Sequence, residues 1–197
     1  TQDRTMVVED STRGTATGLG LAAICGVVYL LSFELMALLP AWLEYAPGVS
    51  LFFLPAGVKL VALLVAGGWG LLGLAVAGLW TAADVWTSAT LLALLGNVVV
   101  WLGIPYLVIR AMLRWLDIHA DLSNLSYLRV MGICLAAIVA TSAAATAYAV
   151  LAHGVPLAEA GARTAAMALG DFAGAGVMFA LLIGVRNLLQ AGRALDH

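Results

Sequence analysis

The chain has 197 residues, of which 63% are hydrophobic and 10% are charged, and its formal net charge is −2. Soluble domains carry charged residues at about a quarter of their positions, so this composition excludes an ordinary water-soluble domain. No cluster of basic residues indicates nucleic-acid binding. The mean hydropathy of +1.05 instead predicts a chain whose main solvent is lipid.

The apolar segments, taken in chain order, predict an all-α polytopic membrane protein. A bilayer core requires about 20 apolar residues per helix, which divides this chain into about six transmembrane helices. We place them at 17–40, 50–67, 69–87, 89–113, 128–152 and 164–188. The expected domain organisation is an N-terminal tail (1–16), one membrane domain (17–190) and a C-terminal tail (191–197).

The segments around the second predicted helix carry the strongest local signals. Pro40 and Pro47 bracket a short loop, a candidate half-helix lying on the membrane surface. Pro55 and Gly57 are expected to kink or open the helix one turn before Lys59, as in the interrupted binding helices of transporters. Gly67 and Gly68 then predict a tight hairpin into the third helix.

The arginines predict the orientation, because cytoplasmic loops of membrane proteins carry an excess of Lys and Arg. Arg163 is the only arginine on one side of the predicted topology. The others fall on the opposite side: Arg4, Arg13, Arg110, Arg114, Arg129, Arg186 and Arg193. Both termini are therefore expected to be cytoplasmic, in the inner membrane of a bacterium.

Polar residues within the predicted helices gather in the outer leaflet. At about 1.5 Å per residue, Glu34, Lys59, Asp84, Asn97 and Asp171 all fall in the half of the bilayer away from the arginines. Such residues are costly in lipid and are functional candidates by default. Two interpretations stay open: a structural pair of Lys59 with Asp171 or Glu34, or a water-filled outer pocket that binds a small ligand or ion.

No motif in the sequence predicts catalysis. There is no HExxH, CxxC, GxSxG or Walker sequence. His119, His153 and His197 lie in loops or at the end of the chain, which does not favour a haem held by paired histidines. We therefore expect no enzymatic activity, no catalytic residue, no metal and no cofactor.

Small residues predict close helix contacts. Gly170 and Gly174 are four residues apart in the last predicted helix, and Ala22 and Gly26 have the same spacing in the first. This spacing lets two helix backbones approach each other in a membrane, and it marks packing more often than a binding site.

Several short motifs, in order, resemble MASE1, a family of integral membrane sensor domains. They are Phe53-Leu54-Pro55-Ala56-Gly57-Val58-Lys59-Leu60 with Trp69, Leu91-Leu92-Ala93-Leu94-Leu95-Gly96-Asn97, and Gly170-Asp171 with Gly174. The resemblance covers about residues 20–190. It implies a sensory domain of the kind that precedes histidine kinases and diguanylate cyclases, with Pro55, Gly57, Asn97, Gly170 and Asp171 as motif positions but no assigned ligand.

The functional expectation is a membrane-embedded sensory or ligand-binding module that acts in signal transduction through a membrane or cytoplasmic partner protein. No kinase or cyclase segment is present up to His197, so either a fragment or a stand-alone module fits. Two alternatives are an accessory subunit of a respiratory or photosynthetic membrane complex, and the substrate-binding subunit of a small-solute transporter. Membrane lipids, and not nucleic acids, are the other expected partners.

Overall fold

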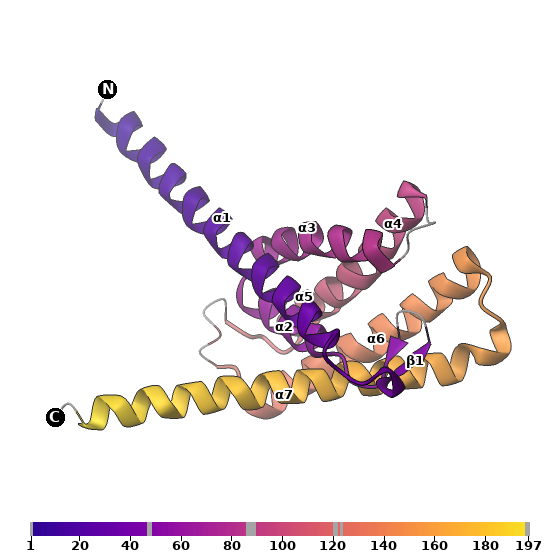
Figure 1. The fold of residues 1–197 in the computed structure, drawn as a ribbon. Coiled ribbons are helices and arrows are strands. Elements are labelled where there is room, and N and C mark those ends of the chain that lie inside the picture. Colours follow the sequence, from indigo (N-terminus) through magenta and orange to yellow (C-terminus); the bar gives the residue numbers. More distant parts are fainter. Residues whose placement is uncertain (1, 47–48, 86–89, 120–121, 123, 196–197) are drawn as a thin grey trace.

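The computed structural model of the protein describes residues 2–46, 49–85, 90–119, 122 and 124–195, with the backbone alone at 2–13, 41, 83–85 and 189–195. These residues are mostly helical (Figure 1). The α-helices are α1 (Gln2–Met36), α2 (Leu54–Val65), α3 (Gly67–Val85), α4 (Leu91–Val98), α5 (Ile104–Trp115), α6 (Tyr127–His153) and α7 (Ala160–Leu195). The short elements are η1 (Ala41–Leu43), β1 (Glu44–Ala46), β2 (Val49–Ser50), the π-helical η2 (Val99–Gly103) and η3 (Leu157–Glu159).

Four helical stretches are long and apolar enough to cross a membrane, which agrees with the predicted all-α membrane protein. They are Gly14–Met36, Leu91–Trp115, Tyr127–His153 and Leu157–Leu188. The remaining apolar helices, Leu54–Val65 and Gly67–Ala82, are shorter. The 12 residues of α2 span only about 18 Å, less than a hydrocarbon core of about 30 Å. The second predicted span is therefore shorter than the sequence indicated.

The chain between α1 and α2 forms a small hairpin, so the expectation of a surface half-helix is wrong. After η1, β1 pairs with β2 in an antiparallel arrangement, and the Leu51 amide donates to the Leu43 carbonyl over 2.7 Å. The extended segment then lies along α7, where the Phe53 amide donates to the Gly170 carbonyl over 3.0 Å. A helix here would withdraw these groups from α7. Pro47 lies outside the described residues.

Pro55 lies in the first turn of α2 and does not interrupt the helix, so the predicted kink is also wrong. Proline in the first turn loses no hydrogen bond, because the amides there have no helical acceptor. The helix runs unbroken from Leu54 through Lys59 to Val65. The predicted tight turn between α2 and α3 is confirmed: α3 begins at Gly67, whose φ of +52° is readily adopted only by glycine.

The π-helical turn η2 lies between α4 and α5, so that Leu91–Trp115 is one long interrupted helix. Pro105 follows this turn directly and has no N–H, so the carbonyl of Trp101 loses its usual helical donor. Single π-turns inside helices occur frequently at functional sites. Here the turn contains Trp101, which becomes part of the candidate site.

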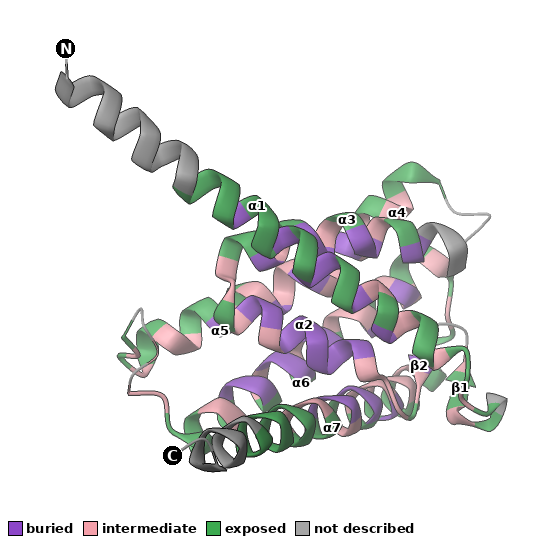
Figure 2. Ribbon diagram, turned by 60° about the vertical axis from the view of Figure 1, so that its left-hand side comes forward, coloured by how far each residue is buried: buried purple, intermediate pink, exposed green. Residues whose placement is uncertain are grey.

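The two ends of the molecule differ. The start of α1 and the end of α7 lie at one end, and the β1–β2 hairpin lies at the other (Figure 1). Helix α2 is the most completely buried element, enclosed by α1, α3 and α7 (Figure 2). The predicted close contact of α1 is present, because Gly26 and Ala22 lie directly against Gly73 of α3. The predicted N-terminal tail falls mostly within α1, which begins at Gln2. The predicted C-terminal tail falls mostly within α7, which ends at Leu195.

Candidate functional site

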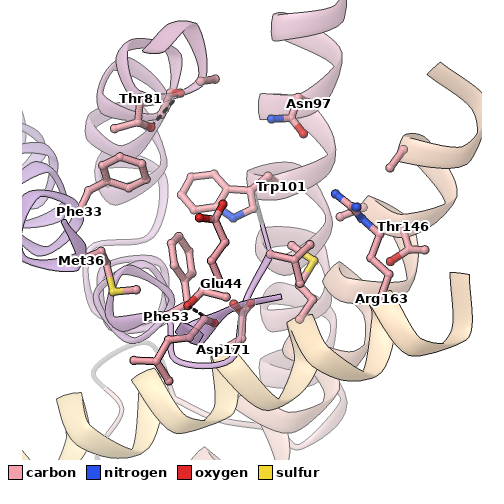
Figure 3. Close-up of a pocket in the computed structure, with 18 of the residues that line it drawn as sticks. Phe33, Met36, Glu44, Phe53, Thr81, Asn97, Trp101, Thr146, Arg163 and Asp171 are labelled. Atoms are coloured by element: carbon pink, nitrogen blue, oxygen red, sulfur yellow. Dashed lines mark hydrogen bonds between the residues drawn. The ribbon is translucent and has the colours of Figure 1, made fainter. Parts of the chain in front are cut away.

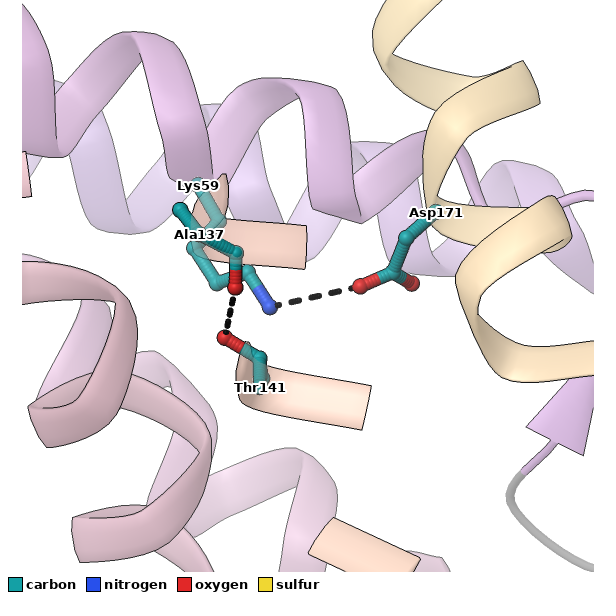
Figure 4. Close-up of polar contacts among 4 residues, drawn as sticks. All are labelled: Lys59, Ala137, Thr141 and Asp171. Atoms are coloured by element: carbon teal, nitrogen blue, oxygen red, sulfur yellow. Dashed lines mark hydrogen bonds and ion pairs between the residues drawn. The ribbon is translucent and has the colours of Figure 1, made fainter. Parts of the chain in front are cut away.

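A buried ion pair joins α2 to α7. Lys59 and Asp171 are only 1% and 2% exposed, and Lys59 Nζ lies 3.8 Å from Asp171 Oδ2 (Figure 4). That separation makes a contact between charges and not a hydrogen bond. The ammonium also lies 4.5 Å from the centroid of the Trp101 ring, a cation–π distance. A carboxylate and an aromatic ring therefore stabilise the single lysine of the chain.

Glycines bring the two charges together. A Cβ added to Gly170 would overlap the Ser50 carbonyl, and one added to Gly174 would overlap the Phe53 carbonyl. On the facing helix, a Cβ at Gly57 would lie 2.8 Å from the carbonyl oxygen of Gly174. Only glycine allows this backbone contact between α7 and the start of α2. Asp171, next to Gly170, is held beside Lys59 as a result.

A cavity of about 430 Å³ lies at the hairpin end of the bundle (Figure 3). Side chains from α1, the hairpin, α3, α4, η2, α6 and α7 line it. The volume is within the range of about 300–1,000 Å³ that is usual for small-molecule sites. Its polar lining includes Glu34, Glu44, Asn97, Thr146, Arg163 and Asp171.

The residues singled out in the sequence fall into separate groups. Glu34, Asn97 and Asp171, which lie on different helices, all line the cavity. Lys59 is not among the lining residues and lies behind Asp171 and Trp101. The side chain of Asp84 is outside the described residues. The motif positions Pro55, Gly57, Gly170 and Gly174 begin or pack helices, and they do not line the cavity.

The cavity lining also includes Glu44, His153 and Arg163, which the sequence does not single out as site residues. Glu44 lines the cavity because the hairpin folds back over the end of the bundle. No local pattern in the sequence predicts this position of the hairpin. For Arg163 a signal was present: it is the lone arginine of the side that is otherwise poor in arginine. A lone arginine at the start of a helix is a candidate site residue, although its depth in the bilayer does not single it out.

Two hydroxyls on α6 have no hydrogen-bond partner within the described part of the chain. They belong to Ser142, which is 0% exposed, and Thr146, which is 3% exposed. The neighbouring Thr141 hydroxyl, by contrast, donates to the Ala137 carbonyl over 2.6 Å (Figure 4). Thr146 lines the cavity and Ser142 does not, so the two residues form a matched pair for experiments.

Tyr148 connects α4 to α6 in the cavity wall. Its hydroxyl donates to the Ala93 carbonyl over 2.9 Å, and its ring meets the His153 ring edge-on at 5.6 Å. Gly96 leaves room for this hydroxyl, since a Cβ there would overlap it. Tyr148 therefore links the two helices in this part of the wall.

Tyr148→Phe is expected to lower the free energy of unfolding by about 1 kcal/mol, the net value of one hydrogen bond. Unfolding of the detergent-purified protein by SDS, followed by circular dichroism, measures the change. Tyr127→Phe is the control, because Tyr127 is 65% exposed. Equal stability of the two variants would show that the bond to Ala93 contributes nothing.

No group of three or more His, Cys, Asp or Glu residues that could hold a metal ion is found in the part of the chain that the structure describes. The chain matches no protein-family model, no curated protein and no solved structure in the comparisons made. The cavity and the ion pair at its wall are therefore the features that indicate a function.

Proposed function

We propose that this protein is a membrane-embedded ligand-binding sensory module that signals to a partner protein through α7. The observation that carries the proposal is the cavity, whose wall includes Asp171 of the buried ion pair. Arg163, Met167 and Asp171 follow one another at four-residue spacing on α7 and all line it. A ligand in the cavity would contact a single face of this helix over two turns.

The proposed topology has about six transmembrane helices, with α2 as a short, internal one. The start of α1 and the end of α7 lie at the same end of the molecule, which supports an even number of crossings. Arg110, Arg114 and Arg129 are in or near the α5–α6 connection, at that same end, and Arg163 lines the cavity together with residues of the hairpin. By the positive-inside rule both termini are cytoplasmic, and the cavity opens to the outside of a bacterial inner membrane.

The coupling follows from where α7 is held. At the cavity its backbone contacts β2 at Gly170 and the start of α2 at Gly174, and Asp171 contacts Lys59. Beyond the cavity, the side chains of residues 181–188 are exposed, so within the described residues little packs against this part of α7. A ligand that favours one position of Asp171 would shift the distal half, provided that its affinity differs between the two positions. The resemblance to MASE1 sensor domains supports the same direction of signalling.

A ligand screen with two matched variants tests the proposal. Wild type, Thr146→Val and Ser142→Ala are each heated with amino acids, amines, carboxylic acids and sugars. A ligand at 100 times its Kd stabilises the protein by about 2.7 kcal/mol, which is a clear shift in Tm. We expect such a shift in wild type and in Ser142→Ala, and a reduced one in Thr146→Val.

Neither substitution removes a hydrogen bond within the described chain, so the basal Tm of both variants should stay close to that of wild type. A ligand that shifts all three proteins alike binds outside the cavity and contradicts the proposal. Uptake of the ligand in cells, dependent on a second subunit, would favour the transporter alternative over signalling.

A further inference from the structure

We infer that the cavity accepts a small zwitterion with an apolar body, a molecule that carries one ammonium group and one carboxylate. This inference rests on the proposed ligand-binding function and names the class of ligand. It follows from three features of the cavity lining: an acidic side, a basic side and an aromatic zone. The acidic side and the basic side come from different elements of the fold.

The acidic side comes from α1 and β1. Glu34 lies in the last turn of α1, and Glu44 opens β1. Both line the cavity, and neither forms an ion pair with a cation among the residues that the structure describes. Glu34 also lies where the α1 macrodipole is negative, because the helix ends at Met36. This side favours a positively charged group of a ligand.

The basic side comes from α6 and α7. Arg163 lies in the first turn of α7, where the helix macrodipole is positive, and His153 ends α6. Both residues interact with other groups of the chain, which helps to orient them. Figure 3 shows Glu44 and Arg163 reaching the cavity from different sides. A carboxylate can accept two parallel hydrogen bonds from a guanidinium, so this side favours the acidic group of a ligand.

The cavity lining also has aromatic residues, and the charges of the ion pair at its wall are balanced. Tyr29, Phe33 and Trp101 line the cavity, and the Tyr29 and Trp101 rings meet at 5.2 Å. Lys59 and Asp171 neutralise each other at the wall, so the pair adds no net charge. A simple amine would bring no acidic group to the basic side, and a simple acid would face the two glutamates of the acidic side. A zwitterion satisfies both sides, which is the requirement for charge complementarity.

Two matched series of compounds test the inference by isothermal titration of the purified full chain. One is phenylalanine, 2-phenylethylamine and 3-phenylpropionate; the other is leucine, 3-methylbutylamine and 4-methylpentanoate. Within a series the body is the same and only the charged groups differ. In at least one series we expect the zwitterion to bind at least tenfold more tightly than either relative.

Charge-neutralising variants assign each end of the ligand. Glu34→Gln with Glu44→Gln should weaken the zwitterion and the amine several-fold and leave the acid unchanged. Arg163→Gln should weaken the zwitterion and the acid and leave the amine unchanged. The control is Arg110→Gln, which changes an exposed arginine far from the cavity lining.

An amine or an acid that binds as tightly as its zwitterion overturns the inference, since one charge then suffices. If none of the six compounds binds while another compound stabilises the protein in a Thr146-dependent way, the zwitterion inference fails and the proposed function survives. If no compound of any class stabilises the protein through Thr146, both fail.

Discussion

Asp171→Asn is expected to lower the free energy of unfolding by about 3–5 kcal/mol, because it leaves the buried Lys59 without its counter-charge. The pair is nearly inaccessible, at 1% and 2% exposure, so solvent cannot replace the lost carboxylate. The Trp101 ring alone offers a contact worth about 2 kcal/mol or somewhat more when desolvated, which does not offset the loss. SDS unfolding of the purified protein measures the change, and Glu34→Gln, an exposed carboxylate, should change stability by less than about 0.5 kcal/mol.

The double variant Lys59→Met, Asp171→Leu should recover most of this loss. Apolar residues of similar volume often replace a buried ion pair without cost, because no charge then has to be desolvated. If the double variant loses as much free energy of unfolding as the two single variants together, the result contradicts a direct interaction between the two side chains. If the double variant is stable and still binds the ligand of wild type, the pair is structural; if it is stable and no longer binds, the pair belongs to the site.

One physical reason lets the sequence offer Asp171 or Glu34 as the partner of Lys59 and single out three residues that line the cavity. In a bilayer, helix rise and hydrocarbon thickness together fix the depth of each residue. This depth predicts that Glu34, Asn97 and Asp171 lie in one leaflet, without any knowledge of which helices are neighbours. All three line the cavity. Cost in lipid also indicated that Lys59 would be paired, and Asp171 is its partner.

The same reasoning could not predict features that depend on non-local contacts. Glu44 reaches the cavity only because β1 and β2 pair, and the extended segment after them is fixed by the backbone of α7. Pro55 has opposite effects in the first turn and in the middle of a helix, and the sequence alone did not place the start of α2. The π-turn that contains Trp101 likewise has no local apolar signature.

The second large effect concerns Gly174. Gly174→Ala should lower the free energy of unfolding by about 3 kcal/mol, at the upper end for overpacking, because the added Cβ would overlap the Phe53 carbonyl. The obstacle is backbone and not a flexible side chain, so α7 itself must move away from the start of α2. Gly176→Ala is the matched control: it lies on the same helix, and a Cβ there would meet no atom within 4 Å.

Because alanine favours helices over glycine by about 1 kcal/mol, the control variant should be as stable as wild type or slightly more so. The displacement of α7 leads to a second expectation, which concerns the cost of Asp171→Asn. If Gly174 brings Asp171 to Lys59, then Asp171→Asn should cost less in the Gly174→Ala background than in wild type, whereas in the Gly176→Ala background its cost should be unchanged. If Asp171→Asn costs the same free energy of unfolding in both backgrounds, the Gly174 contact does not bring Asp171 to Lys59. The proposed route by which α7 responds to a ligand would then be wrong.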